Sequence, residues 1–556
     1  MGKRTSLLNF AAEIFKIYFK KIMKTLKVCL VSTILAATAS TALAGGILTN
    51  TNQSIDFLRN PARDGAIGLD GVYSNPAGVA FMPDGLHLGF NWQYAHQTRT
   101  ITSTNDLFIN GAKNDSHATK TFEGVANAPF IPSLQAAWNT NKWSFQFNFS
   151  VPGGGGKCEF DNGIGSFETA VGAIANKLKS TSDMLNSMIT PLGVSVPKVS
   201  GYDADAYMKG RQYYFGFQLG AARKLTEHLS VYAGVRVLYG SATYEARLNN
   251  IRVMDGDKGI TLPEYIIGVT KGLSDAKSAL TIRTQQAVAA HMATGMTQEQ
   301  AMGQPDVQAI LEQGQKLQGA ADQVAASGEK LSPYANGMNL KSDQTGWGIS
   351  PILGIDYKVG AFNFAAKYEF KTRMRMKNNS DLTDPVIDAT KKFVNGTSVP
   401  EDSPALLTFG AQWSIVKNVR ANLGYHHFFD TKAHWYEHSE KLLSGGTDEY
   451  LAGAEWDIIP RLTVSAGGQL TRYDLTDAYM NDMSFVVNSY SFGFGLNFRI
   501  TDHVMVKAAY FQTNYTNYDM DTPKQEIKSM DIVIPAGHNS FTRTNRVFGL
   551  GCDIDI

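Results

Sequence analysis

Basic side chains recur at alternate positions in one segment of this 556-residue chain. In "FNFAAKYEFKTRMRM" (residues 362–376), a continuous strand would place Lys367, Lys371 and Arg373 on one face and the aromatic residues on the other. Arg236 lies at a matching inward position of an earlier predicted strand. Such cations can bind the anionic head group of a ligand through charge-assisted hydrogen bonds. Alternatively, they form a balanced ion-pair network inside a closed barrel, and the sequence leaves both interpretations open.

Motifs for catalysis or cofactor binding do not occur in the sequence. There is no G-x-S-x-G nucleophile motif, phosphate-binding loop or dinucleotide motif. The "HWYEH" segment (434–438) has two histidines four residues apart, but it does not lie on a predicted helix, and we interpret it as a surface loop. The net charge of +1 provides no general attraction for nucleic acid. We therefore expect a protein that is not an enzyme and has no catalytic residues, metal site, cofactor or nucleic-acid partner.

The elements that must position the basic residues are β-strands. Apolar and polar residues alternate in "GLHLGFNWQYAH" (85–96), "QYYFGFQLGA" (212–221) and "YSFGFGLNFRI" (490–500), as expected for strands with two different faces. About fourteen such segments follow residue 85, and short turns such as "NTNK" and "KVGA" alternate with long connections. This alternation is typical of outer-membrane barrels. The prediction is an all-β, 14-stranded antiparallel transmembrane β-barrel with its aromatic face toward lipid.

Two long connections, near 153–208 and 251–344, contain apolar residues at helical spacing, so we expect helical extracellular loops. The N-terminal part of the chain carries an export signal. From Met23, the predicted start, two lysines precede an apolar run that ends in Ala42-Leu43-Ala44. Residues 1–44 are therefore predicted to be an N-terminal extension and signal peptide, and the barrel is predicted to cover 85–556.

Three motifs carry a resemblance to a known family: "DGVYSNPAGVAFMPDG" (70–85), "FSVPGGGG" (149–156) and "DSPALLTFGAQW" (402–413). With these motifs and its strand count, the chain resembles the FadL-type outer-membrane transporters of long-chain fatty acids, a family that also includes aromatic-hydrocarbon channels. The resemblance implies that residues 45–84 form a hatch inside the barrel. It also implies that cargo is captured at the outer loops and leaves sideways through a kink in the third strand.

The resemblance assigns roles to two groups of residues. Asn75, Pro76, Ala77 and Gly78 would form the gate element of the hatch, close to a strand-3 kink at Pro152, Gly153 and Gly154. Proline removes a ladder donor and glycine weakens a strand, so "VPGGGG" is a reasonable place for strand pairing to fail. Alternatively, Pro152 and Gly153 simply end the strand. A second Asn-Pro-Ala, at 60–62, is predicted to be a turn in the hatch.

The expected function is uptake of hydrophobic compounds, most of all long-chain fatty acids, by a monomer in the outer membrane of a Gram-negative bacterium. The expected partners are a fatty acid or another hydrophobic small molecule and the lipid of that membrane. Two alternatives stay open. One is a general diffusion porin, and the other is a surface adhesin-type barrel whose helical loops bind a partner.

Overall fold

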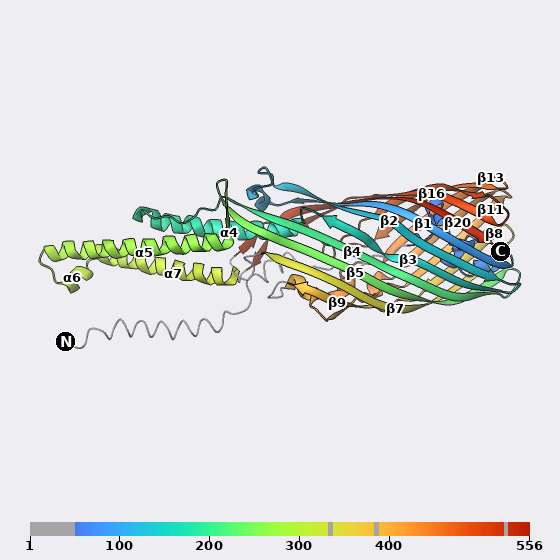
Figure 1. Cartoon of the computed structure of the whole chain (residues 1–556), viewed down its shortest axis with the longest axis horizontal. Helices are drawn as coiled ribbons and strands as arrows, with labels where there is room; N and C mark the ends of the chain where they lie inside the picture. The colour runs from blue at the N-terminus through green and yellow to red at the C-terminus, as the bar shows by residue number, and fades with distance from the viewer. Residues whose placement is uncertain (1–50, 332–336, 383–387, 528–531) are drawn as a thin grey trace.

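The computed structural model describes residues 51–331, 337–382, 388–527 and 532–556 (Figure 1). The predicted signal peptide, the predicted start at Met23 and residues 45–50 of the predicted hatch lie outside the described residues.

The described strands form one closed antiparallel barrel with fourteen positions. Closure comes from β20, which pairs with β16 on one side and with β1 on the other. The barrel strands are β1 (Gly85–Thr104), β2 (Thr119–Asn139), β3 (Trp143–Phe160), β4 (Gly201–Lys224), β5 (Leu229–Asp255), β7 (Met338–Val359), β8 (Phe362–Glu369), β11 (Leu406–Val416), β12 (Val419–Phe428), β13 (Thr447–Ile459), β14 (Leu462–Tyr473), β15 (Ser489–Arg499), β16 (Val504–Tyr515) and β20 (Gly537–Asp555). Short strands extend the sheet or pair outside it: β6 (Lys258–Thr261), β9 (Arg375–Leu382), β10 (Ser398–Pro400), β17 (Tyr518–Thr522), and the hairpin of β18 (Gln525–Ile527) and β19 (Ile532–Ile534).

The alternation seen in the sequence separates the two faces of the barrel. On β1, the side chains of Phe90 and Tyr94 are exposed on the outside, whereas Asn91 and Gln93 are buried inside. From His96 onward the outward residues of β1 are polar, and so are those of the antiparallel β20 that precede Phe548, such as Thr544 and Arg546. The apolar belt that contacts lipid therefore ends near Tyr94 and Phe548, and the barrel wall continues beyond it on the outer side.

Helices gather at one end of the barrel, and the C-terminus lies at the other (Figure 1). They are α4 (Gly165–Ile189), α5 (Leu262–Ala293), α6 (Gln298–Met302) and α7 (Pro305–Leu331), which confirms the predicted helical character of both long loops. A capping box between Thr261 and Glu264 begins α5, and its 32 residues make a rod of about 48 Å. Within the described ranges, no helix is both long enough and apolar enough to cross a membrane.

The N-terminal segment (residues 51–84) lies inside the barrel, where nearly all of it is buried. It contains α3 (Ile55–Arg59), η1 (Leu69–Val72) and η2 (Gly78–Phe81). Ser54 caps α3 by accepting a hydrogen bond from the backbone N–H of Phe57. The other short helices are in the outer loops: η3 (Asp106–Asn110), η4 (Thr190–Leu192), η6 (Asp388–Phe393), η7 (Asp430–Lys432) and η8 (Tyr436–Leu442).

One predicted strand is broken, which changes where its side chains point. The segment 362–376, predicted as one continuous strand, contains β8 and the start of β9, separated by an irregular stretch at 370–374 in which Thr372 bridges to Ser403. Lys367 and Glu369 are buried before this stretch, but Thr372 and Met374 are the buried residues after it. The alternation has slipped by one residue, and such a slip moves every later side chain to the opposite face. The prediction that Arg373 points inward is therefore wrong, since Arg373 is exposed.

Candidate functional site

Pairing between β2 and β3 is interrupted over a long stretch. The ladder runs from Asn139↔Ser144 to Leu134↔Phe149 and resumes only at Val125↔Glu159. We call the unpaired residues, 126–133 of β2 and 150–158 of β3, the β2–β3 interruption. Pro129 and Pro132 lie on the β2 side and lack the N–H that a ladder requires. The prolines of "APFIPS" (128–133) on β2 carry the same signal as "VPGGGG" on β3, but only the β3 residues were among the predicted site residues.

β3 is irregular at the predicted kink. Its pairing with β4 shifts between Ser150 and Gly153, and again between Gly153 and Gly156. At each shift three residues of β3 face two of β4, so the strand carries two extra residues, as in β-bulges. Gly154 has φ +108°, and a Cβ there would lie 2.3 Å from the carbonyl oxygen of Gln212. Pro152, Gly153 and Gly154 therefore lie in an irregular strand that continues to Phe160, not at the end of the strand.

Gln53 of the N-terminal segment occupies the edge of β3 that β2 leaves unpaired. Its side-chain amide donates to the carbonyl oxygen of Val151 at 3.1 Å and accepts from the N–H of Val151 at 2.9 Å. The Ser133 hydroxyl on β2 donates to the backbone oxygen of Gln53 at 2.6 Å. Gln53 thus connects β2 to β3 across the interruption, and both Gln53 and Val151 are buried.

The Asn-Pro-Ala-Gly tetrad lies inside the barrel, but not beside Pro152. Pro76 accepts a hydrogen bond from the Gln146 side chain of β3 at 2.7 Å. Gln146 is six residues before Pro152, or about 20 Å along an extended strand. The prediction that the tetrad lies beside Pro152 and Gly153 is therefore wrong. The residue of the N-terminal segment that contacts this part of β3 is Gln53, through Val151.

The contacts of the tetrad fix it to several strands. The Asn75 amide donates to Asp356 of β7 at 2.6 Å, and its oxygen accepts from the N–H of Gly78 at 3.1 Å. Ala77 accepts from Ser230 of β5 at 2.6 Å. The earlier Asn-Pro-Ala is a turn, as predicted: Asn60 ends α3, and its side chain accepts from the N–H of Ala62 at 3.3 Å.

Two of the predicted head-group cations are already neutralised. Arg236 and Lys367 both pair with Glu369, at 2.5 and 2.7 Å. Lys367 also donates to the backbone oxygen of Tyr73 at 2.8 Å, and the two cations lie 4.8 and 4.7 Å from the Tyr73 ring centroid. They therefore hold Tyr73 of the N-terminal segment, which corresponds to the ion-pair alternative.

The other two predicted cations do not join them. Lys371 is half-buried, pairs with Asp402 at 3.2 Å and donates to the backbone oxygen of Lys432 at 2.9 Å. Arg373 is exposed on the opposite face of the sheet. The four cations proposed from the sequence thus do not form a common site.

Buried ion pairs anchor the N-terminal segment on the side of β12 to β16. Glu455 of β13 accepts from Arg59 at 2.7 Å and from Arg63 at 2.9 Å. Asp56 pairs with Lys507 of β16, which also pairs with Asp553 of β20 at 2.5 Å. A further set of contacts joins Asp64 to His426 at 2.9 Å and His426 to Glu449 at 2.7 Å.

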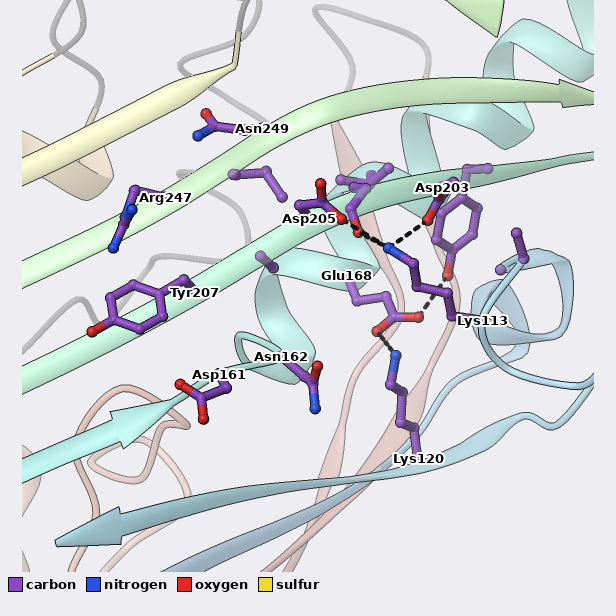
Figure 2. A pocket seen from close by; sticks show the side chains of 17 residues that line it. Lys113, Lys120, Asp161, Asn162, Glu168, Asp203, Asp205, Tyr207, Arg247 and Asn249 are labelled. Carbon is purple, nitrogen blue, oxygen red and sulfur yellow. Dashed lines mark hydrogen bonds and ion pairs between the residues drawn. The ribbon is translucent and has the colours of Figure 1, made fainter. Parts of the chain in front are cut away.

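A polar pocket of about 360 Å³ lies at the outer end, between the β1–β2 loop, α4, β4 and β5 (Figure 2). Lys113 pairs there with Asp203 and Asp205, both at 2.9 Å, and Lys120 pairs with Glu168 at 2.7 Å. These pairs tie the outer loops to one another. Among the described residues, no cluster of His, Cys, Asp and Glu side chains could hold a metal ion.

The structure also shows two inward arginines that sequence reasoning missed, Arg99 of β1 and Arg543 of β20. The strand alternation could have placed both on the lumen face. That they lie opposite one another follows only from closure of the barrel, which brings the first and last strands together.

No protein-family model matches this chain, and no curated protein matches it in sequence. Among solved structures, a FadL homologue of Pseudomonas aeruginosa superposes with a TM-score of 0.54 at 13% identity, over 92% of this chain and 100% of that one. The protein has a FadL-type fold.

Two other solved structures are similar over most of their length. The Ralstonia pickettii toluene transporter TbuX has a TM-score of 0.45 at 12% identity, covering 92% of this chain and 97% of that chain. The Pseudomonas putida toluene transporter TodX has a TM-score of 0.43 at 13% identity, covering 93% and 98%. The closed fourteen-position barrel and its outward apolar belt make this chain an outer-membrane protein.

Proposed function

We propose that this FadL-type barrel takes up hydrophobic compounds across the outer membrane of a Gram-negative bacterium and releases them sideways through the β2–β3 interruption. The residues 51–84 act as its hatch. The observation that carries the proposal is the missing ladder between β2 and β3. In a barrel wall, unpaired backbone groups in contact with lipid are unfavourable, so an interruption of this length calls for a functional reason.

The position of the interruption supports release into the membrane. On β1, Ala95 pairs with Ala128 and Gln93 with Ile131, so the unpaired part of β2 lies level with the upper end of the apolar belt. An amphiphile leaving there enters lipid directly. Each methylene group that stays out of water keeps about 0.8 kcal/mol of favourable transfer free energy.

The N-terminal segment inside the barrel weighs against a general diffusion porin. The N-terminal segment is anchored to β3, β5, β7, β8, β13 and β16. One void beside this segment, lined by Tyr73, Pro152 and Arg236, has a volume of about 20 Å³, which is room for about one water molecule.

The test restores the regular register of β3. Deleting Pro152 and Gly154 removes one residue from each bulge and gives β3 a regular register with β4. We expect uptake of radiolabelled oleate and toluene by cells expressing this variant to fall to the level of cells without the protein. Deleting Gly295 and Met296, in the connection after α5, is the matched control and should leave uptake unchanged. Normal uptake by a folded variant with a regular β3 would refute lateral release.

The adhesin alternative has the projecting α5–α7 hairpin in its favour. Replacing residues 262–331 with a short Gly-Ser linker separates the two functions. Under the proposed function, uptake of toluene through the barrel persists without the hairpin. If uptake is absent from cells with the unmodified chain, and cell attachment is lost with the hairpin, the adhesin function is the correct one.

A further inference from the structure

Two arginines face each other inside the barrel without a carboxylate between them. Arg99 and Arg543 are directly opposite in the β1–β20 ladder. Residues paired in this way have Cβ atoms about 4.5–5.5 Å apart. Both lie on the same face as the inward Asn91 and Gly549, and both side chains are half-buried, so their charges line the interior.

Neither guanidinium has an acidic partner among the described residues. Arg543 has only a long hydrogen bond to Gln97, at 3.4 Å, and a contact with the ring of Tyr515 at 5.2 Å. The Nε atoms of both arginines are buried and have no hydrogen-bond partner.

This pair differs from the other cations of the lumen. Arg236, Lys367 and Lys507 each contact at least one buried carboxylate. Like charges directly opposite in a sheet are unfavourable, and a charge shielded from water without a partner is more so. A bound anion would neutralise the two facing arginines. Arginine is suited to bind one, because its planar guanidinium donates two parallel hydrogen bonds to a carboxylate.

The residues around Arg99 and Arg543 indicate what kind of molecule would carry that anionic group. Arg99 is opposite Gly124 of β2, next to Val125, which makes the first pair above the β2–β3 interruption. On the same level the interior is apolar, with Ile101, Phe122, Cys158 and Phe160 in one cluster. A charged head at the arginines would therefore have its tail among apolar side chains, with the interruption directly below.

We infer that Arg99 and Arg543 together bind the carboxylate of an amphiphile, and that its apolar tail lies toward the β2–β3 interruption. The inference rests on the proposed function, because it names the cargo class: a hydrophobic chain with one anionic head. It moves the head-group site from the predicted Arg236, Lys367, Lys371 and Arg373 to the junction of the first and last strands.

Binding measurements on the purified full chain test this inference. The ligands are oleate and its neutral counterpart, oleyl alcohol, added to detergent-solubilised protein and followed by competition with a fluorescent fatty acid. The double variant Arg99→Gln/Arg543→Gln should bind oleate at least about tenfold more weakly, the loss expected for a bidentate charged contact, and should bind the alcohol as the unmodified chain does. The control is Arg546→Gln, which removes an exposed cation from the outer face of the same strand and should bind both ligands normally.

A second measurement distinguishes binding from support of the fold. Removing two opposed, unpaired cations should leave the thermal transition of the empty protein unchanged or raise it, whereas loss of structural residues would lower it. Unchanged oleate affinity in the double variant, or a lowered transition with equal loss of both ligands, overturns the inference. Displacement of oleate by an equal concentration of inorganic phosphate also overturns it, since that would reveal a general anion site.

These outcomes are separable from failure of the proposed function. If the variant lacking Pro152 and Gly154 still takes up toluene, lateral release is wrong. Oleate binding to the two arginines can still be measured on the purified protein. If the arginine substitutions leave oleate binding unchanged and the variant lacking Pro152 and Gly154 loses uptake, lateral release is supported and only the head-group site is wrong.

Discussion

Gln53→Ala is expected to loosen the closed state of the β2–β3 interruption without unfolding the barrel. The substitution removes the two hydrogen bonds to Val151, at 2.9 and 3.1 Å. A buried hydrogen bond contributes about 0.5–1.5 kcal/mol net, so the two together contribute about 1–3 kcal/mol. The population in which the Val151 backbone is free should rise by about 5- to 150-fold.

Amide hydrogen exchange of a peptide that contains Val151 measures this change directly. Ser54→Ala is the matched control: it removes the cap of α3 at the neighbouring position and costs about 1 kcal/mol, but Ser54 has no hydrogen bond to β3 among those the structure shows. Exchange at Val151 should accelerate in the Gln53 variant and not in the control. Equal exchange in both variants would refute the assignment of Gln53 as the residue that holds β3, and uptake of hydrophobic compounds should increase if this contact limits release.

Other predictions concern stability. Gly154→Ala should lower the unfolding temperature, because alanine at φ +108° costs about 1–3 kcal/mol and its Cβ would clash with Gln212; an unchanged temperature would mean that the bulge can relax. Glu455→Gln removes the carboxylate that Arg59 and Arg63 of the N-terminal segment share, while Asp56 and Asp70 still pair with them, so we expect a loss of about 1–3 kcal/mol. Protease should then cleave residues 51–84 faster, and single-channel leakage should rise. Burial raises the pKa of Asp430, in an outer loop, to about 7. The folded state therefore keeps a proton that the unfolded state releases between about pH 4 and 7, and stability falls as pH rises through that range. Asp430→Asn should remove this fall, so the variant should melt above the unmodified chain at pH 8, and an identical pH profile would contradict the assignment.

The barrel itself could be predicted from the sequence, because each strand shows its two faces in its own residues. "GLHLGFNWQYAH" is enough to place Phe90 outside and Asn91 inside, and short turns such as "NTNK" indicate which strands are neighbours. The irregularity of β3 was also visible locally, because proline and glycine act on their own backbone.

Contacts between distant segments could not be predicted in this way. Gln53 and Val151 are 98 residues apart, and nothing in either residue indicates the other. The one-residue slip in alternation after Glu369 could not be seen in the sequence, because the residue types of "KTRMRM" continue the alternating pattern of "FNFAAKYEF". In the structure, residues 370–374 do not continue the strand. Where the Asn75 tetrad sits along the lumen depends on Gln146, Ser230 and Asp356, which come from three different strands.

The ion pair between Asp56 and Lys507 has a consequence for assembly, since its partners are 451 residues apart. Residues 51–84 are synthesised before the barrel strands, yet Lys507 of β16, which pairs with both Asp56 and Asp553 of β20, is in place only when the end of the chain has joined the barrel. Contacts over such separations pay a large loop-closure entropy before they stabilise anything, so they form late. The lumen is thus sealed in the last step of folding, and a barrel that stalls before β20 closes would be an open hole in the membrane.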